Sequence, residues 1–183
     1  MSITNTILRR LWHVALNAAI VALPIATLHA EGVAQWGKQY AFVVQEDLEL
    51  AHDFLVKVDV ASGLVVRRFD VIENGITYVA SNTSRQKMYF VENSLDRLVE
   101  LDIHSGTVQR YFVSGDPRGI AVTPDGSRVL VAQYDTDSLA VFDANNLSAG
   151  PVHVVSVGDR PIGVAVRPDG NIAYVSNHGS HSV

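Results

Sequence analysis

The 183-residue sequence contains no cysteine, which excludes disulfide bonds, thiolate metal ligands, covalent haem attachment and a lipid-modified N-terminal cysteine. An excess of positive charge is also missing, since 14 Lys and Arg stand against 19 Asp and Glu, for a formal net charge of −5. No basic patch stands out, so a nucleic acid is not favoured as a partner. The sequence also lacks a nucleophile elbow, a phosphate-binding glycine loop and a recognisable carboxylate pair. It therefore predicts no catalytic residue and favours a protein that is not an enzyme.

The first thirty residues have the order of an export signal. Arg9 and Arg10 form a positive start, an apolar stretch covers 11–28, and Ala30 offers a small residue for cleavage. The alternative is a retained membrane anchor, because the stretch has about the 20 residues needed to span a bilayer, although polar residues interrupt it. We expect cleavage of 1–30, which leaves a periplasmic or secreted protein with no stable membrane anchor.

A repeat of 41 to 44 residues organises the rest of the chain. The octapeptide Gly-Ile-Ala-Val-Thr-Pro-Asp-Gly at 119–126 recurs as Gly-Val-Ala-Val-Arg-Pro-Asp-Gly at 163–170, 44 residues later. A more diverged match links the Asp-x-x-Ser-Gly segments at 59–63 and 102–106, which are 43 residues apart. Self-similarity at this period indicates a repeat architecture.

Each repeat contains four short apolar runs separated by turn residues. In the clearest repeat the runs cover 119–123, 128–133, 138–143 and 152–157. Several runs are apolar without interruption, which predicts strands that are buried on both faces. Four-stranded antiparallel sheets of this kind, at about 40–45 residues per repeat, are the blades of a β-propeller. The Asp125 and Asp169 carboxylates belong to Pro-Asp-Gly turns, so the turn geometry explains them without a catalytic role.

The last repeat resembles the YVTN repeat. The resemblance rests on residues 161–170, on Ala-Tyr-Val-Ser-Asn at 173–177 with Ser176 in place of the family threonine, and on 181–183. It covers roughly residues 40–183. It implies an all-β fold, a β-propeller of four-stranded antiparallel blades, with about three and a half blades present.

The predicted organisation is a signal peptide at 1–30 and a partial propeller at 31–183. Its repeat units lie near 76–117, 118–161 and 162–183, with a diverged blade near 39–75. The seven blades usual in the family would need about 300 residues at this repeat length. We therefore interpret the chain as the N-terminal fragment of a longer propeller.

Linkers between blades and loops between second and third strands emerge on one face of a propeller. Ligand-binding candidates on that face are Arg118, Arg160, Asp135 and Asp137. Arg118 and Arg160 occupy nearly equivalent linker positions, and guanidinium groups fork onto carboxylates and phosphates, so together they could bind an anion. The alternative is that each arginine pairs with the acid beside it, Asp116 or Asp159.

His178 and His181 flank Gly-Ser in one loop of the same face. Two imidazoles at this spacing could hold a metal ion if Asp135 or Asp137 supplied a carboxylate. The alternative is a pair of solvated turn histidines.

The export signal, the regular repeats and the lack of a catalytic frame favour a non-catalytic binding or scaffold propeller of the periplasm or cell envelope. Its expected partner is a small anionic ligand or an envelope protein, and no particular cofactor is predicted. Two alternatives stay open: a lactonase-like hydrolase with a metal at the channel mouth, and a periplasmic propeller associated with a redox cofactor.

Overall fold

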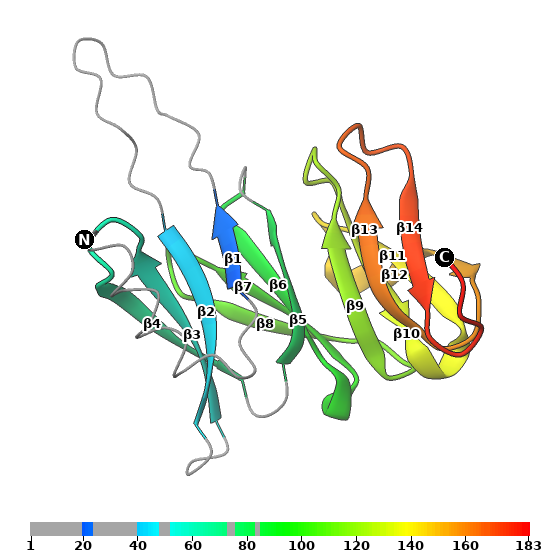
Figure 1. The fold of residues 1–183 in the computed structure, drawn as a ribbon, viewed down its shortest axis with the longest axis horizontal. Coiled ribbons are helices and arrows are strands. Elements are labelled where there is room, and N and C mark those ends of the chain that lie inside the picture. Colours follow the sequence, from blue (N-terminus) through cyan, green and yellow to red (C-terminus); the bar gives the residue numbers. More distant parts are fainter. Residues whose placement is uncertain (1–19, 24–39, 48–51, 73–75, 83–84) are drawn as a thin grey trace, which may run out of the picture. The chain divides into compact units, whose positions relative to one another are not determined.

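A computed structural model describes residues 20–23, 40–47, 52–72, 76–82 and 85–183 (Figure 1). The chain divides into two compact units, residues 1–73 and 74–183. Regular structure in the described residues consists of β-strands and three short 3-10 turns. No helix among them has the length and apolar character needed to cross a membrane.

The first unit holds one antiparallel sheet. Its strands, in spatial order, are β1 (Ile20–Leu23), β2 (Tyr40–Asp47), β3 (His52–Asp59) and β4 (Val65–Ile72). Phe42, Leu55 and Phe69 are buried. Strand β1 comes from the segment predicted to be an export signal, whose arginine pair and cleavage site at Ala30 lie outside the described residues. If the signal is cleaved, β1 leaves with it and β2–β4 remain.

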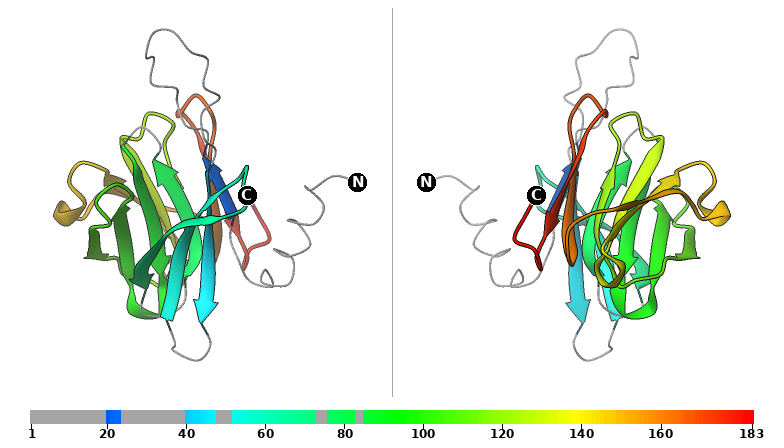
Figure 2. Two further views of the ribbon diagram at one scale, coloured as in Figure 1. Left: turned by 90° about the vertical axis from the view of Figure 1, so that its left-hand side faces the viewer. Right: turned by 90° about the vertical axis from the view of Figure 1, so that its right-hand side faces the viewer.

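The second unit contains two complete antiparallel sheets and a hairpin. The first sheet is β5 (Ile76–Asn82), β6 (Lys87–Glu92), β7 (Arg97–Asp102) and β8 (Val108–Phe112). The second is β9 (Pro117–Val122), β10 (Arg128–Gln133), β11 (Ser138–Asp143) and β12 (Pro151–Ser156). The hairpin is β13 (Pro161–Val166) and β14 (Ala173–Asn177), seen from two sides in Figure 2. In both complete sheets the spatial order follows the chain order, as in a propeller blade.

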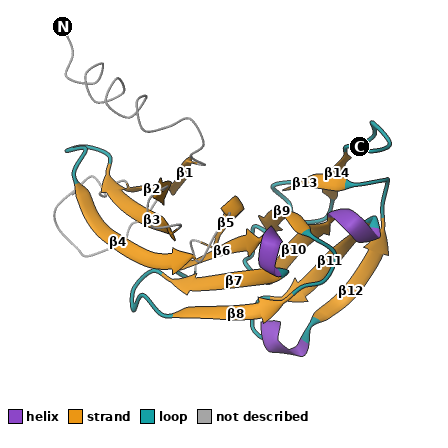
Figure 3. Ribbon diagram, turned by 90° about the horizontal axis from the view of Figure 1, so that it is seen from below, coloured by secondary structure: helices purple, strands orange, loops and turns teal. Residues whose placement is uncertain are grey.

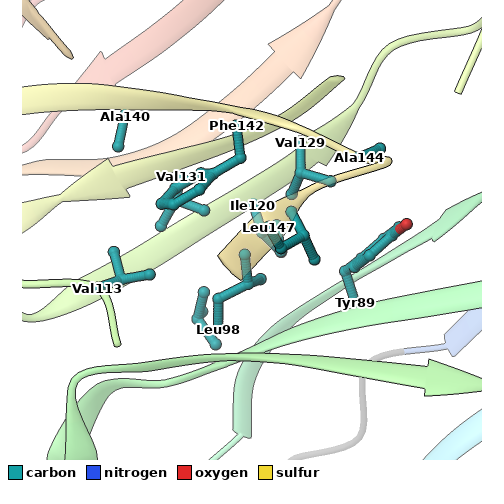
Figure 4. Packing of buried hydrophobic residues seen from close by; sticks show 11 residues of the cluster. Tyr89, Leu98, Val113, Ile120, Val129, Val131, Ala140, Phe142, Ala144 and Leu147 are labelled. Carbon is teal, nitrogen blue, oxygen red and sulfur yellow. The ribbon is translucent and has the colours of Figure 1, made fainter. Parts of the chain in front are cut away.

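The packing of strand β10 on both of its faces explains why its sequence is apolar without interruption. Val129 and Val131 pack into a core shared with the β5–β8 sheet, where they meet Tyr89 and Leu98 (Figure 4). Leu130, between them in sequence, points to the other face and packs into a core shared with the β13–β14 hairpin. Since successive strand residues face opposite sides, burial on both faces requires this run. Strands β10 and β11 match the predicted runs at 128–133 and 138–143.

The predicted turns are confirmed. The Gly126 N–H donates to the Thr123 carbonyl at 2.8 Å, and Gly126 has a φ of +69°, which favours glycine. The Gly170 N–H donates to Arg167 in the same way at 2.8 Å. At the end of β7, the Asp102 carboxylate accepts the Ser105 N–H at 2.8 Å, as expected for a side-chain-capped turn.

The first strands of successive sheets approach backbone to backbone. A Cβ atom placed on Gly119 of β9 would lie 2.9 Å from the Gly163 Cα of β13 and 2.9 Å from the Ile162 carbonyl oxygen. Only a residue without a side chain allows this approach. The glycine at this point of the repeat therefore sets the spacing of the inner strands.

The expectation of burial on both faces is wrong for β12. All six of its residues are exposed, because β12 is the outermost strand of its sheet and none of the other strands that the structure describes pairs with its outer edge (Figure 3). In the β13–β14 hairpin, Val175 is buried but Tyr174 is 51% exposed, so one face of the hairpin packs and the other is open.

Candidate functional site

Five segments of the second unit form what we call the linker face. They are the linkers 113–117 and 157–161, and the hairpin loops 93–96, 134–137 and 178–181. Each linker is hydrogen-bonded to the loop of the sheet before it and to the loop of the sheet after it. The linker face is therefore built from two repeats of one arrangement.

The loops 93–96 and 134–137 each end in an aspartate that accepts a hydrogen bond from the following linker. The Asp96 Oδ1 accepts the Asp116 N–H at 3.0 Å, and the Asp137 Oδ1 accepts the Arg160 N–H at 2.7 Å. All four residues have positive φ, between 49° and 53°. This left-handed conformation is costly for residues other than glycine, and aspartate tolerates it better than most. The carboxylate therefore fixes a linker conformation that arginine would not adopt by itself.

The loop of the next sheet holds the linker from the other side. The Tyr134 N–H donates to the Asp116 carbonyl at 3.2 Å, and the His178 N–H donates to the Arg160 carbonyl at 2.9 Å. Tyr134 and His178 stand at the same point of successive repeats. Each linker is thus fixed at both its N–H and its carbonyl group.

Arg118 is neutralised by its neighbour. Its Nε and one terminal nitrogen donate to the same Asp116 oxygen at 3.0 and 2.7 Å. These hydrogen bonds raise the pKa of Arg118, and the nearby Asp135 carboxylate adds to the effect. The guanidinium also lies over the Tyr134 ring, 4.4 Å from its centre. The alternative of a pair with the adjacent acid therefore holds for Arg118.

Arg160 differs from Arg118 in its partners. Its guanidinium lies 5.8 Å from the centre of the same Tyr134 ring, so one ring has two arginines beside it. In the part of the chain that the structure describes, no carboxylate lies within ion-pair distance of Arg160, Asp159 included. Arg160 is exposed, so its charge faces solvent. An anion could accept hydrogen bonds from this guanidinium without displacing a protein partner.

The two predicted metal ligands lie side by side on the same face. The His178 and His181 rings are stacked with their centres 6.4 Å apart, and both residues are exposed. Across the described residues, no group of three His, Asp or Glu side chains lies close enough to share one metal ion. The metal site stays a prediction. Asp135 is exposed and forms part of the Tyr134–Thr136 turn, where its N–H donates to Gly115.

A buried polar residue ends the second strand of each sheet in this unit. Glu92, Gln133 and Asn177 are all less than 8% exposed. The Gln133 amide donates to the Ser114 carbonyl at 2.8 Å, which ties the strand end to the preceding linker. The last residue of the Tyr-Val-Ser-Asn segment, Asn177, therefore occupies a structural position beneath the linker face.

Sequence reasoning missed Tyr134. Its position in the loop is occupied by Asn93 and His178 in the neighbouring repeats, so residue identity does not mark it. The available signal was its place in the repeat, in the loop that follows the second strand of the sheet whose first strand contains Arg118.

No protein-family model and no curated protein sequence matches this chain. Solved structures with a similar fold include a Kuenenia stuttgartiensis hydrazine synthase, with a TM-score of 0.67 and 16% identity over 78% of this chain and 54% of that chain. A functionally unknown protein from Desulfotomaculum acetoxidans DSM 771 has a TM-score of 0.63 and 17% identity, over 76% and 45%. A mitotic checkpoint complex chain has a TM-score of 0.62 and 15% identity, over 75% and 42%.

This chain thus spans about half the length of the structures it resembles. At such low identities the likeness shows the fold alone. Together with the three four-stranded antiparallel sheets and the β13–β14 hairpin, it shows that the chain is an all-β, partial β-propeller.

Proposed function

We propose that the chain is an exported, non-catalytic binding propeller that takes a small anionic ligand at the linker face. The observation that carries the proposal is the Arg160 guanidinium, which is exposed, lies beside Tyr134 and has no carboxylate within ion-pair distance among the described residues. Asp137 fixes the backbone that bears it. A positioned guanidinium with free donors suits a carboxylate or a phosphate.

The surroundings of Arg160 support an anion more than a cation. Arg118 is already satisfied by Asp116, so it supplies a second positive group whose charge is largely balanced. The Tyr134 ring lies against both guanidinium groups, and cation–π contact of this kind restrains their motion. Arg160 is therefore the arginine whose hydrogen-bond donors remain available to a ligand, and Tyr134 helps to orient it.

The compartment and the family are part of the same proposal. The signal-like order of residues 1–30 supports the periplasm or the cell envelope as its place of action. The residues of 161–177 support placement in the YVTN-repeat group of propellers. Binding, rather than catalysis, follows from the lack of a recognisable catalytic frame in the sequence.

The test is isothermal titration calorimetry of the full chain with inorganic phosphate and with succinate. Arg160→Asn removes the guanidinium but keeps a residue that tolerates positive φ, so the linker conformation is preserved. A charge-assisted hydrogen bond contributes roughly 1.5–3 kcal/mol, so we expect affinity to fall by about tenfold or more. Arg167→Gln is the matched control, because Arg167 is also exposed but lies in a turn beside Asp169. Equal affinities of Arg160→Asn and the parent chain would contradict the proposal.

A further inference from the structure

The connection between β3 and β4 carries a group of exposed apolar side chains. We call residues 60–66 the apolar turn. Its large apolar side chains are 46%, 68%, 52% and 53% exposed in the order Val60, Leu64, Val65 and Val66. Exposed apolar side chains that gather in one place mark a contact with another protein or with a membrane.

The corresponding turn of the next repeat, at 102–107, is polar. Both turns are closed by an aspartate carboxylate that accepts the N–H three residues later, at 2.9 Å in the apolar turn and at 2.8 Å in the polar turn. At the repeat spacing of 43 residues, Leu64 corresponds to Thr107. Val66 corresponds to Gln109 in the same way. The turn geometry therefore does not require apolar side chains at these places, so their presence needs a separate cause.

Two cations lie opposite each other next to the apolar turn. Lys57 of β3 is the register partner of Arg67 of β4. Like charges directly opposite each other destabilise a sheet. Burial lowers the pKa of Lys57, and the positive charge of Arg67 lowers it further. An anionic partner at this place would therefore relieve a repulsion within the fold.

Aromatic rings restrain these two cations. The Lys57 Nζ lies 3.8 Å from the centre of the Tyr40 ring, and the Arg67 guanidinium carbon lies 4.6 Å from the centre of the Phe69 ring. Arg68 follows and is exposed. Between Lys57 and the end of β4 the chain has three cations and two acids, although its overall formal net charge is −5. The surroundings of the apolar turn are therefore positive in an acidic protein.

We propose that the apolar turn inserts into the surface of an anionic lipid bilayer, with Lys57, Arg67 and Arg68 among the lipid headgroups. Apolar side chains gain by burial at the boundary between headgroups and acyl chains, and cations are attracted to anionic lipids. A bilayer fits better than a protein partner because residues 60–66 include no aromatic residue, the type that most often anchors protein interfaces. So small an apolar surface gives reversible binding rather than an anchor.

The absence of cysteine allows an environment-sensitive fluorophore to be attached at one chosen position of the full chain. Ala61→Cys places the dye NBD at an exposed position of the apolar turn, and His104→Cys places it at the corresponding exposed position of the polar turn. We expect vesicles that contain phosphatidylglycerol to strengthen and blue-shift the emission at 61 and to leave the emission at 104 unchanged. Since the dye reports on its own turn, vesicle binding by residues 1–30 does not produce this signal. Unchanged emission at 61, an equal change at 104, or an equal response to pure phosphatidylcholine vesicles would overturn the proposal.

Substitution by the residues of the polar turn tests the apolar side chains in the labelled chain. Leu64→Thr combined with Val66→Gln should raise the lipid concentration for half-maximal response by about tenfold or more, because apolar burial is lost. The matched control is Val152→Thr combined with Val154→Gln on β12, which also replaces exposed apolar side chains and should leave the response unchanged. Equal weakening by the two pairs, with melting temperatures like that of the parent, would overturn the proposal.

The cations are tested separately at low salt. Arg67→Gln and Arg68→Gln should each weaken binding to phosphatidylglycerol vesicles by about fivefold, the contribution expected of one cation near an anionic membrane surface. Added salt should weaken binding of the parent chain more than that of the double variant, because salt screens the attraction. Vesicle binding that depends neither on these arginines nor on salt would overturn the role of the anionic lipid.

Discussion

At the scale of single residues, Asp137 and Arg160 are linked by conformation as well as by a hydrogen bond. Both have positive φ, 49° and 53°, and the Asp137 Oδ1 accepts the Arg160 N–H at 2.7 Å. Asparagine and glycine both tolerate this conformation, but only asparagine keeps the acceptor. Comparing these two substitutions therefore isolates the hydrogen bond.

We expect Asp137→Asn to retain anion binding and Asp137→Gly to weaken it. The glycine variant loses the bond that holds the linker, so the guanidinium is less well positioned. The free energy of unfolding should fall by about 1 kcal/mol or less, because the bond is exposed. Calorimetric titration with phosphate and thermal unfolding check the two effects. Equal phosphate affinity in the two variants would show that Asp137 does not position Arg160.

The turn carboxylate Asp125 makes stability depend on acid. Hydrogen bonds from the Thr123 hydroxyl at 2.5 Å and from the Ser127 N–H at 3.0 Å lower its pKa to about 2. The unfolded value is about 3.9, so the stabilisation is complete above about pH 4 and is lost as the pH falls toward 2. We expect the melting temperature of Asp125→Asn to lie below that of the parent at pH 6, with the difference shrinking at pH 2. A difference independent of pH would contradict this account.

At the scale of elements, Gly119 determines how closely β9 and β13 approach. Alanine at this position would place its Cβ 2.9 Å from the Gly163 Cα, and backbone atoms cannot move aside cheaply. We expect Gly119→Ala to lower the free energy of unfolding by about 1–3 kcal/mol. Gly163→Ala is the control, because its Cβ would meet the Ser176 hydroxyl at 2.7 Å, a side-chain atom that can rotate away. Denaturant unfolding that finds Gly163→Ala as destabilised as Gly119→Ala would contradict this account.

Much of the sheet structure could be predicted from the sequence. Burial on both faces requires uninterrupted apolar runs. The bounds of β10 and β11 could therefore be predicted to the residue from such runs. The exposure of β12 could not be predicted, because its apolar sequence resembles theirs and only its outermost place in the sheet sets it apart. Strand β1 was missed because its sequence has the character of an export signal.

The candidate site was predictable only in part. The equivalent places of Arg118 and Arg160 in the repeat were visible, and the neighbouring acid marked the Arg118–Asp116 pair as an alternative. Arg118 and Arg160 have different partners because their side chains take different directions. This difference could not be predicted from the similar sequences around the two arginines. Tyr134 matters because the guanidinium groups of Arg118 and Arg160 both lie beside its ring. These contacts join segments that are separate in the sequence, so the sequence of one loop does not predict them.

At the scale of the whole molecule, the proposed export would change the first sheet. Cleavage after Ala30 would remove β1 together with the signal, so β2 would become an edge strand. We expect N-terminal sequencing of exported material to begin at Glu31 or within a few residues of it. The amides of β2 should then exchange with solvent faster in the exported form than in the full chain, because one of their partners is lost. An intact Met1 on membrane-bound material would contradict cleavage and favour an anchor.

The linker face of this partial propeller is proposed to bind an anion around Arg160. The most direct test is a phosphate titration of the isotope-labelled full chain, followed by the amide resonances in two-dimensional NMR. We predict shifts at Tyr134, Arg160 and His178, whose N–H or carbonyl groups form the linker contacts, and no shifts at the Gly126 and Gly170 turns. Shifts at those turns, or none at the linker face, would contradict the account.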